Sequence, residues 1–237
     1  MKNVTLVVTM YNEIFCLPPF LEGIRGAFSD YIFVDGGEDG ASSDGSIELV
    51  EKEGYTIYPK EFNYNMAAMK NYGLELAKTK WRLVLDTDEI MSQGMKKFIT
   101  EFSEPNPSNY CISFFRDTYM DGGVIDAAPL DFPIRLMDEK AFYKSPTDTI
   151  HEQVIIHPTT QIHRFWGGRL FHRKDSFRQA KNNLINELVL RGERKIPKNR
   201  GLFWSSELNK AQFVELIPEG RKVVRLEEYL EGPYLNI

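Results

Sequence analysis

An acidic cluster, Asp86-Thr87-Asp88-Glu89, directly follows the apolar run at residues 81–85 and is the segment best suited to chemistry. A short apolar run that ends in carboxylates is typical of a buried strand, and open α/β sheets bind ligands at the carboxyl ends of such strands. Mg²⁺ and Mn²⁺ prefer oxygen ligands and commonly bind one or two carboxylates together with substrate phosphates. The cluster therefore predicts a metal-dependent site for a diphosphate. The alternative is a solvated acidic turn.

The histidines and cysteines offer a second candidate metal chemistry. All four histidines lie in residues 151–172, but His151, His157 and His163 recur every six residues without a close ligand pair or a cysteine partner. Structural zinc is therefore not expected. Cys16 and Cys111 match neither a disulfide framework nor a zinc pattern, so we expect buried free thiols.

Apolar strands that alternate with helices must position the acidic cluster. In the first half we expect strands at 4–9, 31–34, 56–58 and 81–85, and helices at 17–28, 46–53 and 65–78. Strands and helices that alternate in this way indicate right-handed βαβ units on a parallel sheet. This half should bind a nucleotide at the carboxyl edge of its sheet.

The second half has a different pattern, in which strands and turns follow one another more closely. We expect a helix at 94–102, strands at 110–115, 133–137 and 153–157, a hairpin turn at 121–123, and helices at 175–191 and 207–216. These elements predict a mixed, more antiparallel half and a helical C-terminal extension.

The bulk composition is that of an ordinary globular protein, with 237 residues, 42% hydrophobic and 27% charged. A chain of this length can bury one large α/β domain with an extension. No apolar stretch reaches the length of a membrane span, and the first residues enter a strand pattern without a signal-peptide layout. We therefore expect a cytoplasmic protein.

The charge is unevenly distributed along the chain. Residues 1–163 hold 14 Lys and Arg against 25 Asp and Glu, whereas residues 164–225 hold 15 against 6. A basic stretch of this kind can face an anionic partner, either nucleic acid or lipid headgroups at a membrane to which the protein binds peripherally. The alternative is a solvated basic face that serves solubility.

Four segments together resemble the family 2 glycosyltransferases over roughly residues 4–175. In chain order they are Val7-Val8-Thr9-Met10-Tyr11-Asn12-Glu13, then Phe33-Val34-Asp35-Gly36-Gly37 with Ser42-Ser43-Asp44-Gly45-Ser46, then Ala68-Met69-Lys70-Asn71-Tyr72-Gly73, and last Asp86-Thr87-Asp88. Their order and spacing carry the resemblance, because an unrelated fold would need all four coincidences.

The resemblance implies an α/β fold of the GT-A type, a Rossmann-like nucleotide-binding sheet, parallel or mixed, flanked by helices. On this basis we expect a GT-A domain at 1–175 and a helical C-terminal extension at 176–237. Within the domain, residues 1–103 would form the nucleotide-sugar-binding half and residues 104–175 the acceptor half.

The resemblance also implies roles on the donor side. Asp88 would bind Mn²⁺ or Mg²⁺, a Lewis acid toward the departing diphosphate, with Asp86 as a second ligand, reaching the ion through water, or nearer the ribose. The donor-binding residues that the motifs imply are Thr9, Tyr11, Glu13, Asp35, Lys70, Asp86 and Thr87. Asp35 would accept from a base N–H of the kind that uracil or thymine offers. Its alternative role is that of a turn residue before Gly36-Gly37.

The chain departs from the family pattern at three places on the donor side. Lys70 stands where family members commonly carry Arg, and lysine lacks the bidentate guanidinium fork that binds phosphate. Thr9 stands where the family often has Pro, and the loop between Asp35 and Ser42 is longer than usual. The last two departures bear on which base the protein reads.

The acceptor half resembles the branch of family 2 that includes lipopolysaccharide core sugar transferases. The segments that carry this resemblance are Phe132-Pro133-Ile134-Arg135-Leu136-Met137, Ile150-His151-Glu152 and Leu170-Phe171-His172. In that branch the His-Glu pair lies at the acceptor side of the donor sugar, so Glu152 is the expected general base and Asp148 its rival. Glu152 as a surface carboxylate on an edge strand is the alternative.

Three further residues of this half have implied roles. Arg135 is expected to bind the acceptor. His172 is expected to be a late metal ligand of the kind common in GT-A folds, and the alternative is a structural histidine bonded to backbone. The segment at 161–166 nearly reproduces the Gln-x-x-Arg-Trp signature of processive polysaccharide synthases, with Trp166 displaced by one position. We expect transfer of a single sugar, with Trp166 stacking on the acceptor unless it is a core aromatic.

The expected function is that of an inverting, metal-dependent glycosyltransferase of the hexosyltransferase type. It would move one sugar from a nucleotide sugar, expected to be a UDP-sugar, to a hydroxyl of a glycan or lipid-linked acceptor. One alternative acceptor is a hydroxylated base in DNA, with the basic stretch binding phosphates. The acidic first half and the absence of a nucleic-acid motif count against it.

The sequence lacks features expected of two other classes of protein. A non-catalytic nucleotide- or glycan-binding module would not need Asp86, Asp88 and Glu152, and all three are intact. A nucleotidyltransferase would need a glycine-rich, basic phosphate loop after the first strand, where residues 11–13 stand instead.

Overall fold

The computed structural model describes residues 3–37, 40–63, 65–103, 110–120, 123–125, 131–145, 152–174 and 223–225. The chain divides into two compact units, one made of Met1–Arg116 and Leu130–His172, the other of Asp117–Pro129 and Arg173–Ile237. The helices expected at 175–191 and 207–216, and so the helical character of the C-terminal extension, lie outside the described residues.

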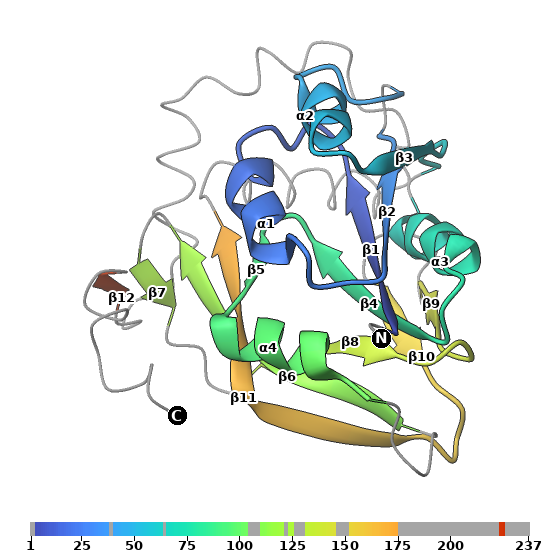
Figure 1. Cartoon of the computed structure of the whole chain (residues 1–237), viewed down its shortest axis with the longest axis vertical. Helices are drawn as coiled ribbons and strands as arrows, with labels where there is room; N and C mark the ends of the chain where they lie inside the picture. The colour runs from blue at the N-terminus through green and yellow to red at the C-terminus, as the bar shows by residue number, and fades with distance from the viewer. Residues whose placement is uncertain are drawn as a thin grey trace, which may run out of the picture. The chain divides into compact units, whose positions relative to one another are not determined.

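Four parallel strands form the centre of the first unit, and Figure 1 shows their arrowheads directed toward the same edge. They are β1 (Val4–Met10), β2 (Asp30–Asp35), β3 (Thr56–Pro59) and β4 (Trp81–Asp86), in the order β3-β2-β1-β4. Every residue of β1 is buried. A strand with neighbours on both sides and helices on both faces is buried throughout, which explains why the sequence here is mainly apolar, with Thr5 and Thr9 as the polar exceptions.

Helices connect these strands and cover both faces of the sheet. They are α1 (Leu17–Ile24), α2 (Ser46–Lys52) and α3 (Met66–Leu76). The apolar side chains form two clusters, one with Leu6 and Val8 of β1, the other with Val7 and residues of α3. This division follows from strand geometry, since successive side chains point to opposite faces.

Local sequence features determine where α3 begins and how closely it packs on the sheet. The Asn65 side chain caps the helix by accepting from the backbone N–H of Ala68 at 3.0 Å, as cap residues of this type do. Gly73 lies against the sheet, because a Cβ at this position would be 2.4 Å from Cγ1 of Val7. The helix therefore approaches β1 closely, and its first turn lies at the carboxyl edge of the strands.

The remaining strands of the first unit are mostly antiparallel, which confirms the mixed α/β fold expected from the sequence. They are β5 (Glu89–Met91), β6 (Tyr110–Met120), β8 (Ile134–Met137), β9 (Phe142–Lys144), β10 (Gln153–Ile155) and β11 (Gln161–Lys174), with α4 (Gln93–Glu101) after β5. Strand β8 pairs antiparallel with both β4 and β6, whereas β9 and β10 form a separate two-stranded sheet.

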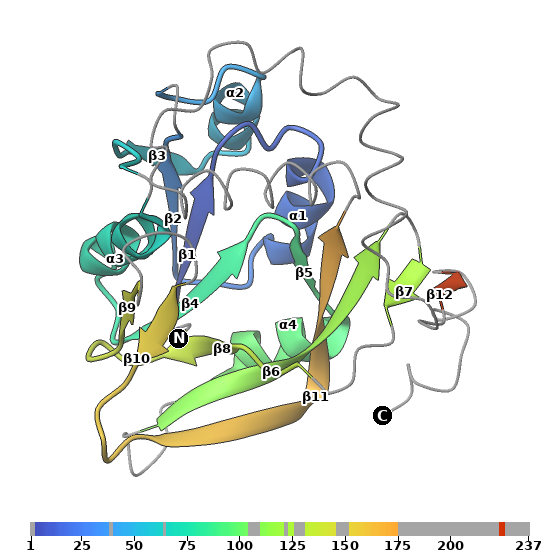
Figure 2. The same ribbon diagram turned by 180° about the vertical axis from the view of Figure 1, so that it is seen from behind.

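Strand β11 is long and was not expected as a strand from the sequence. It runs beside β6 in Figure 2 and pairs antiparallel with β5 at residues 170–172. The Gln-x-x-Arg-Trp-like segment lies on this strand. Glycines allow α4 to approach it, since a Cβ at Gly94 would be 2.2 Å from the carbonyl oxygen of Gly167.

The second unit contains β7 (Gly123–Ile125), β12 (Val223–Arg225) and the last residues of β6. Tyr119 pairs with Val124 and Met120 with Gly123, which is the pairing of the expected hairpin. Among the residues that the structure describes, no helix is both long and apolar enough to cross a bilayer.

Candidate active site

The predicted donor-binding residues lie where three parallel strands end. The register pairs Thr9 with Val34 and with Asp86, and Met10 with Asp35. The last residues of β1, β2 and β4 therefore form one row along the carboxyl edge of the sheet, as the sequence predicted. Open α/β sheets bind their ligands outside this edge.

The loop after β1 is held against the segment that follows β2. Asn12 has a positive φ of 53°, and its backbone N–H donates to the Ser42 hydroxyl at 2.8 Å while its side-chain oxygen accepts from the Ser43 N–H at 2.9 Å. The ring of Tyr11 packs on Gly37, where a Cβ would be 2.2 Å from the ring. Tyr11 is thus fixed beside the strand end that carries Asp35.

Asp35 is almost completely buried, with 2% of its surface exposed. Its carboxylate accepts from the backbone N–H of Ser42 at 3.0 Å and from the Ser42 hydroxyl at 2.5 Å. An ionised carboxylate offers about four lone-pair positions, so these two bonds leave acceptor capacity for a base N–H. Glu13 is held in the same loop, since its backbone N–H donates to Ser46 Oγ at 2.7 Å.

Lys70 is the central cation of the site. Its side chain is 1% exposed, and its ammonium nitrogen lies 2.9 Å from Oδ1 of Asp86 and 2.5 Å from Oε1 of Glu152. The structure therefore brings together the first carboxylate of the acidic cluster, on the donor side, and the predicted general base, on the acceptor side. Asp148, the rival base, lies outside the described residues.

The charged side chains in this group shift one another's pKa values. Burial alone would lower the pKa of the Lys70 ammonium, but the carboxylates of Asp86 and Glu152 outweigh it and raise that pKa above its usual value. For Asp86, burial acts to raise the pKa, and Lys70 together with Arg135 reverses this and holds the pKa below its usual range. Lys70 and Asp86 are therefore both ionised at neutral pH.

A chain of alternating charges extends from Lys70 across the sheet. Arg135 binds Oδ2 of Asp86 at 3.0 Å and also binds Glu89, which is completely buried. Glu89 in turn binds Arg116 at 2.9 Å, and Arg116 binds Asp131 at 2.5 Å. The sequence reasoning did not assign Glu89, Arg116 or Asp131, because their partners lie 15 to 46 residues away along the chain.

A register shift places Arg135 in this network. Ile112 pairs with Leu136 and Ser113 with Ile134, so Arg135 is an extra residue on β8. Bulges of this kind redirect a side chain and are common next to active sites. Its predicted contact with acceptor stays a prediction, and its side chain is 7% exposed.

Asp88 and His172 form the part of the site suited to a divalent ion. Strand β11 pairs His172 with Glu89, next to the acidic turn, and His172 Nε2 lies 3.4 Å from Oδ2 of Asp88. Two adjacent ligands of one octahedral ion lie about 3 Å apart, so this distance fits. No group of three or more His, Cys, Asp or Glu side chains in the described ranges is arranged to hold a metal.

The remaining member of the acidic cluster, Thr87, is buried with 4% of its surface exposed. Across the same turn, the backbone N–H of Asp86 donates to Oε2 of Glu89 at 3.3 Å. Of the four residues, Asp88 alone is neither buried nor bound to a neighbouring Lys or Arg among the described residues.

Tyr143 is a site residue that the sequence reasoning missed. Its ring centre lies 5.4 Å from the Lys70 ammonium nitrogen, and its hydroxyl is buried with no hydrogen-bond partner in the described part of the chain. Burial raises the pKa of this phenol. The only sequence signal for Tyr143 was an aromatic side chain in an apolar segment.

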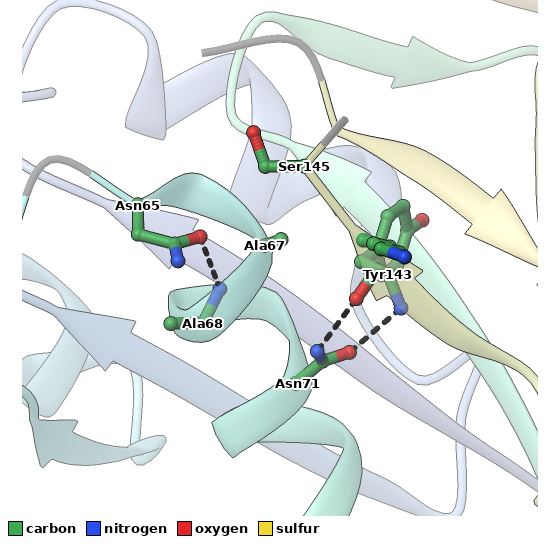
Figure 3. A pocket seen from close by; sticks show the side chains of 7 residues that line it. Asn65, Ala67, Ala68, Asn71, Tyr143 and Ser145 are labelled. Atoms are coloured by element: carbon green, nitrogen blue, oxygen red, sulfur yellow. Dashed lines mark hydrogen bonds between the residues drawn. The ribbon is translucent and has the colours of Figure 1, made fainter. Parts of the chain in front are cut away.

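A pocket of about 250 Å³ lies between the start of α3 and β9 (Figure 3). It is lined by Asn65, Ala67, Ala68, Asn71, Tyr143, Lys144 and Ser145. The Asn71 amide donates to the Tyr143 carbonyl at 2.8 Å and accepts from its N–H at 2.7 Å, as the dashed lines show. The pocket is smaller than typical ligand sites, which begin at roughly 300 Å³.

Trp166, the predicted acceptor-stacking residue, is not a core side chain. It is 56% exposed, and its ring packs against the rings of Phe132, with centroids 4.7 Å apart, and Phe115, with centroids 6.2 Å apart. It therefore presents an aromatic face to solvent on β11.

Several solved structures resemble the chain at low sequence identity. Crystal structures of TarS from S. aureus include one with 13% identity and a TM-score of 0.49, covering 80% of this chain and 40% of TarS. A complex of TarS residues 1–349 with UDP-GlcNAc has 17% identity and a TM-score of 0.38, covering 51% of this chain and 35% of that one.

The mannosyltransferase PcManGT from Pyrobaculum calidifontis, in complex with GDP-Man and Mn²⁺, has 19% identity and a TM-score of 0.38. The match covers 48% of this chain and 35% of PcManGT. The chain thus spans less than two thirds of each of these solved structures. No curated protein matches it.

A family model described as glycosyl transferase family 2 matches residues 5–179, which is most of the chain. The matched residues include all four motifs on which the resemblance was based, and both the parallel and the mixed parts of the sheet. The chain therefore belongs to glycosyl transferase family 2, as its sequence predicted.

Proposed function

We propose that this protein transfers a single sugar from a nucleotide sugar, with a UDP-sugar as the preferred donor, to a hydroxyl of a glycan or lipid-linked saccharide, with inversion. The observation that carries the proposal is the position of Lys70. Its ammonium contacts both Asp86, at the end of a parallel strand, and Glu152, directly before β10 of the antiparallel pair. One buried cation thus joins the two carboxylates that the donor and acceptor chemistry needs.

The donor would lie along the carboxyl edge of β1, β2 and β4. Asp35 has acceptor capacity left for a base N–H, and the ring of Tyr11 beside it suits stacking on the base. Thr9, Glu13 and Thr87 complete the predicted contacts along this edge. A base that offers an N–H to a carboxylate, as uracil does, fits Asp35.

Asp88 and His172 would hold a Mn²⁺ or Mg²⁺ ion, which would complete its coordination with phosphate oxygens and water. When bound, the ion supplies Lewis-acid stabilisation for the charge of the departing diphosphate. Lys70 adds a fixed positive charge beside the same edge, and its second partner, Glu152, keeps it directed toward the acceptor side.

Glu152 is the proposed general base. Its carboxylate takes the proton of the acceptor hydroxyl while that oxygen bonds to the anomeric carbon and the bond from that carbon to the diphosphate breaks. Attack from the side opposite to the leaving group inverts the configuration. The ion pair with Lys70 holds the Glu152 carboxylate in one place, which is a requirement for this step.

Resemblance of residues 132–137, 150–152 and 170–172 to the lipopolysaccharide core sugar transferase branch supports a lipid-linked saccharide as acceptor. Arg135 and Trp166 are the residues proposed to contact it, with Trp166 the more accessible of the two.

The proposal is tested by nucleotide release from a panel of UDP-, dTDP- and GDP-sugars with MnCl₂. We expect release from at least one UDP-sugar, lowered by roughly 100-fold or more in Asp88→Ala, because an electrostatic contact to the leaving group is lost. Glu152→Gln should lower kcat for transfer by about 10²–10⁴ with donor KM unchanged. Glu101→Ala, on the exposed end of α4, is the matched control.

Equal nucleotide release by the wild type and Asp88→Ala with every donor would overturn the proposal. If Asp148→Asn lost transfer while Glu152→Gln retained it, the general base would be Asp148.

A further inference from the structure

A partly exposed group of rings and guanidinium groups lies on β6, β11 and the segment before β8. It consists of Phe115, Phe132, Arg164, Trp166 and Arg169 and is called the aromatic–arginine patch. Its rings contact one another, with the Phe115 and Phe132 centroids 5.4 Å apart and Trp166 packed on both. Trp166 is nonetheless 56% exposed.

Two arginines lie over these rings. The guanidinium carbon of Arg164 lies 5.2 Å from the ring centre of Phe132, and that of Arg169 lies 5.3 Å from the ring centre of Phe115. A guanidinium group stacked on a ring keeps its N–H donors directed outward from its rim, in the plane that binds carboxylate or phosphate. Arg164 forms no salt bridge within the described residues.

The acid next to Phe132 in the chain is paired with an arginine outside the patch. Asp131 precedes Phe132, and its carboxylate is bound by Arg116 at 2.5 Å. Arg116 follows Phe115, so the patch adjoins the outer end of the charge network that leads through Glu89 and Arg135 to the active site. An aromatic face and a positive charge therefore lie together on the acceptor half of the sheet.

We infer that the aromatic–arginine patch is an acceptor subsite for a saccharide that carries an anionic group, a carboxylate or a phosphate. The inference rests on the proposed function and adds the charge of the acceptor to it. A sugar ring stacks on the Trp166 indole, and the anionic group binds the guanidinium group of Arg164. The fixed position of Trp166 between two rings suits a rigid sugar face.

Binding is tested without donor or metal, using trigalacturonate and its fully methyl-esterified form. The two probes have the same rings, and only the first is charged. ¹H–¹⁵N spectra of the full chain report binding through the Trp166 indole N–H, assigned by its absence in Trp166→Phe. We expect shifts of this signal with trigalacturonate and binding roughly fivefold weaker for the ester, as for a partly exposed ion pair.

Two variants distinguish the contribution of the aromatic ring to binding from that of the positive charge. Isothermal titration calorimetry measures binding by these variants, because the Trp166 signal is absent when Trp166 is replaced. Trp166→Ala should weaken binding of both probes by up to about tenfold, whereas Arg164→Ala should remove only the preference for the charged probe. Ile162→Ala is the control, because Ile162 is 52% exposed on the same strand and lies outside the patch. Maltotriose with and without a 6-phosphate distinguishes phosphate from carboxylate as the preferred anion.

Three results would overturn the inference: no shift of the Trp166 signal with either charged probe, equal affinity for charged and uncharged probes, or loss of preference in Ile162→Ala. Binding to phosphatidylglycerol vesicles that depends on Trp166, without saccharide binding, would identify a membrane surface instead and would also overturn it. Saccharide binding by a protein that releases nucleotide from no donor would leave the subsite standing and reject the proposed function.

Discussion

Lys70 and Asp86 form an ion pair in which the two side chains differ greatly in exposure. The nitrogen and oxygen lie 2.9 Å apart, yet the lysine side chain is 1% exposed and the aspartate side chain 33%. The carboxylate thus faces the site while the ammonium is enclosed by α3, Tyr143 and the Glu152 carboxylate. A buried cation of this kind depends on its partners for its stability.

Replacing Lys70 with Met should lower the free energy of unfolding by about 2–4 kcal/mol, because it leaves the Glu152 and Asp86 carboxylates without their shared cation. Lys70→Arg should recover part of the loss, since the charge is restored. Urea unfolding measures both. Lys52→Met, on the exposed face of α2, is the control and should change stability little. Equal loss in the two Met variants would contradict the prediction.

The pH dependence of this stabilisation follows from the two shifted groups. The pKa of Asp86 is lowered, so its contribution is present above the unfolded-state pKa, about 3.9, and is lost as pH falls through the lower folded-state value. The pKa of Lys70 is raised, so its contribution is present below about 10.4 and is lost as pH rises through the higher folded-state value.

Between about pH 5 and pH 9 the difference in unfolding free energy between wild type and Lys70→Met should therefore be constant. It should shrink below about pH 4. Urea midpoints measured across this range check the prediction, and a difference that changes steadily between pH 5 and 9 would contradict it.

Asp88→Asn should weaken Mn²⁺ binding in the presence of UDP by roughly 10- to 100-fold while leaving the urea midpoint nearly unchanged. The reason is that Asp88 contacts His172 but none of the buried cations. His172→Ala should have a similar effect. Electron paramagnetic resonance of free Mn²⁺ measures the affinity, with Glu101→Gln as the control. Unchanged affinity in both Asp88→Asn and His172→Ala would reject these residues as metal ligands.

Cys111 should resist alkylation in the folded protein. Its side chain is completely buried, and burial raises the pKa of its thiol to about 11, so the thiol is protonated at pH 8. Cys16, which the sequence predicted to be buried as well, is partly exposed. Iodoacetamide at pH 8 should therefore label Cys16 alone without denaturant and both cysteines in urea, as mass spectrometry of the peptides would show. Equal labelling rates in the folded state would contradict this.

The parallel half of the fold could be predicted because each of its elements has a local signal. The apolar runs of β1 and β4 are buried on both faces, and Asn65 caps α3 as its residue type suggests. Strand β11 could not be predicted in the same way. Residues 161–164 are all exposed, so they show no alternation between apolar and polar side chains.

The position of the site could be predicted from its motifs. The ion pairs between residues far apart in the chain could not. Residues from all four motifs lie near the carboxyl edge of the parallel sheet, where Lys70 is 2.9 Å from Asp86, and the binding roles implied for them stay predictions. Glu89 belongs to the same acidic cluster but is a buried partner of Arg116 and Arg135. Nothing in the local sequence distinguishes that role from metal binding, since the partners come from β6 and β8.

The two hydrogen bonds between the Asn71 side chain and the backbone of Tyr143 have a mechanical consequence. They attach β9, and through its pairing β10, which directly follows Glu152, to the same helix that carries Lys70. The ion pair between Lys70 and Glu152 joins the same two parts of the structure a second time. A displacement of α3 alone would therefore strain both the hydrogen bonds to Tyr143 and this ion pair.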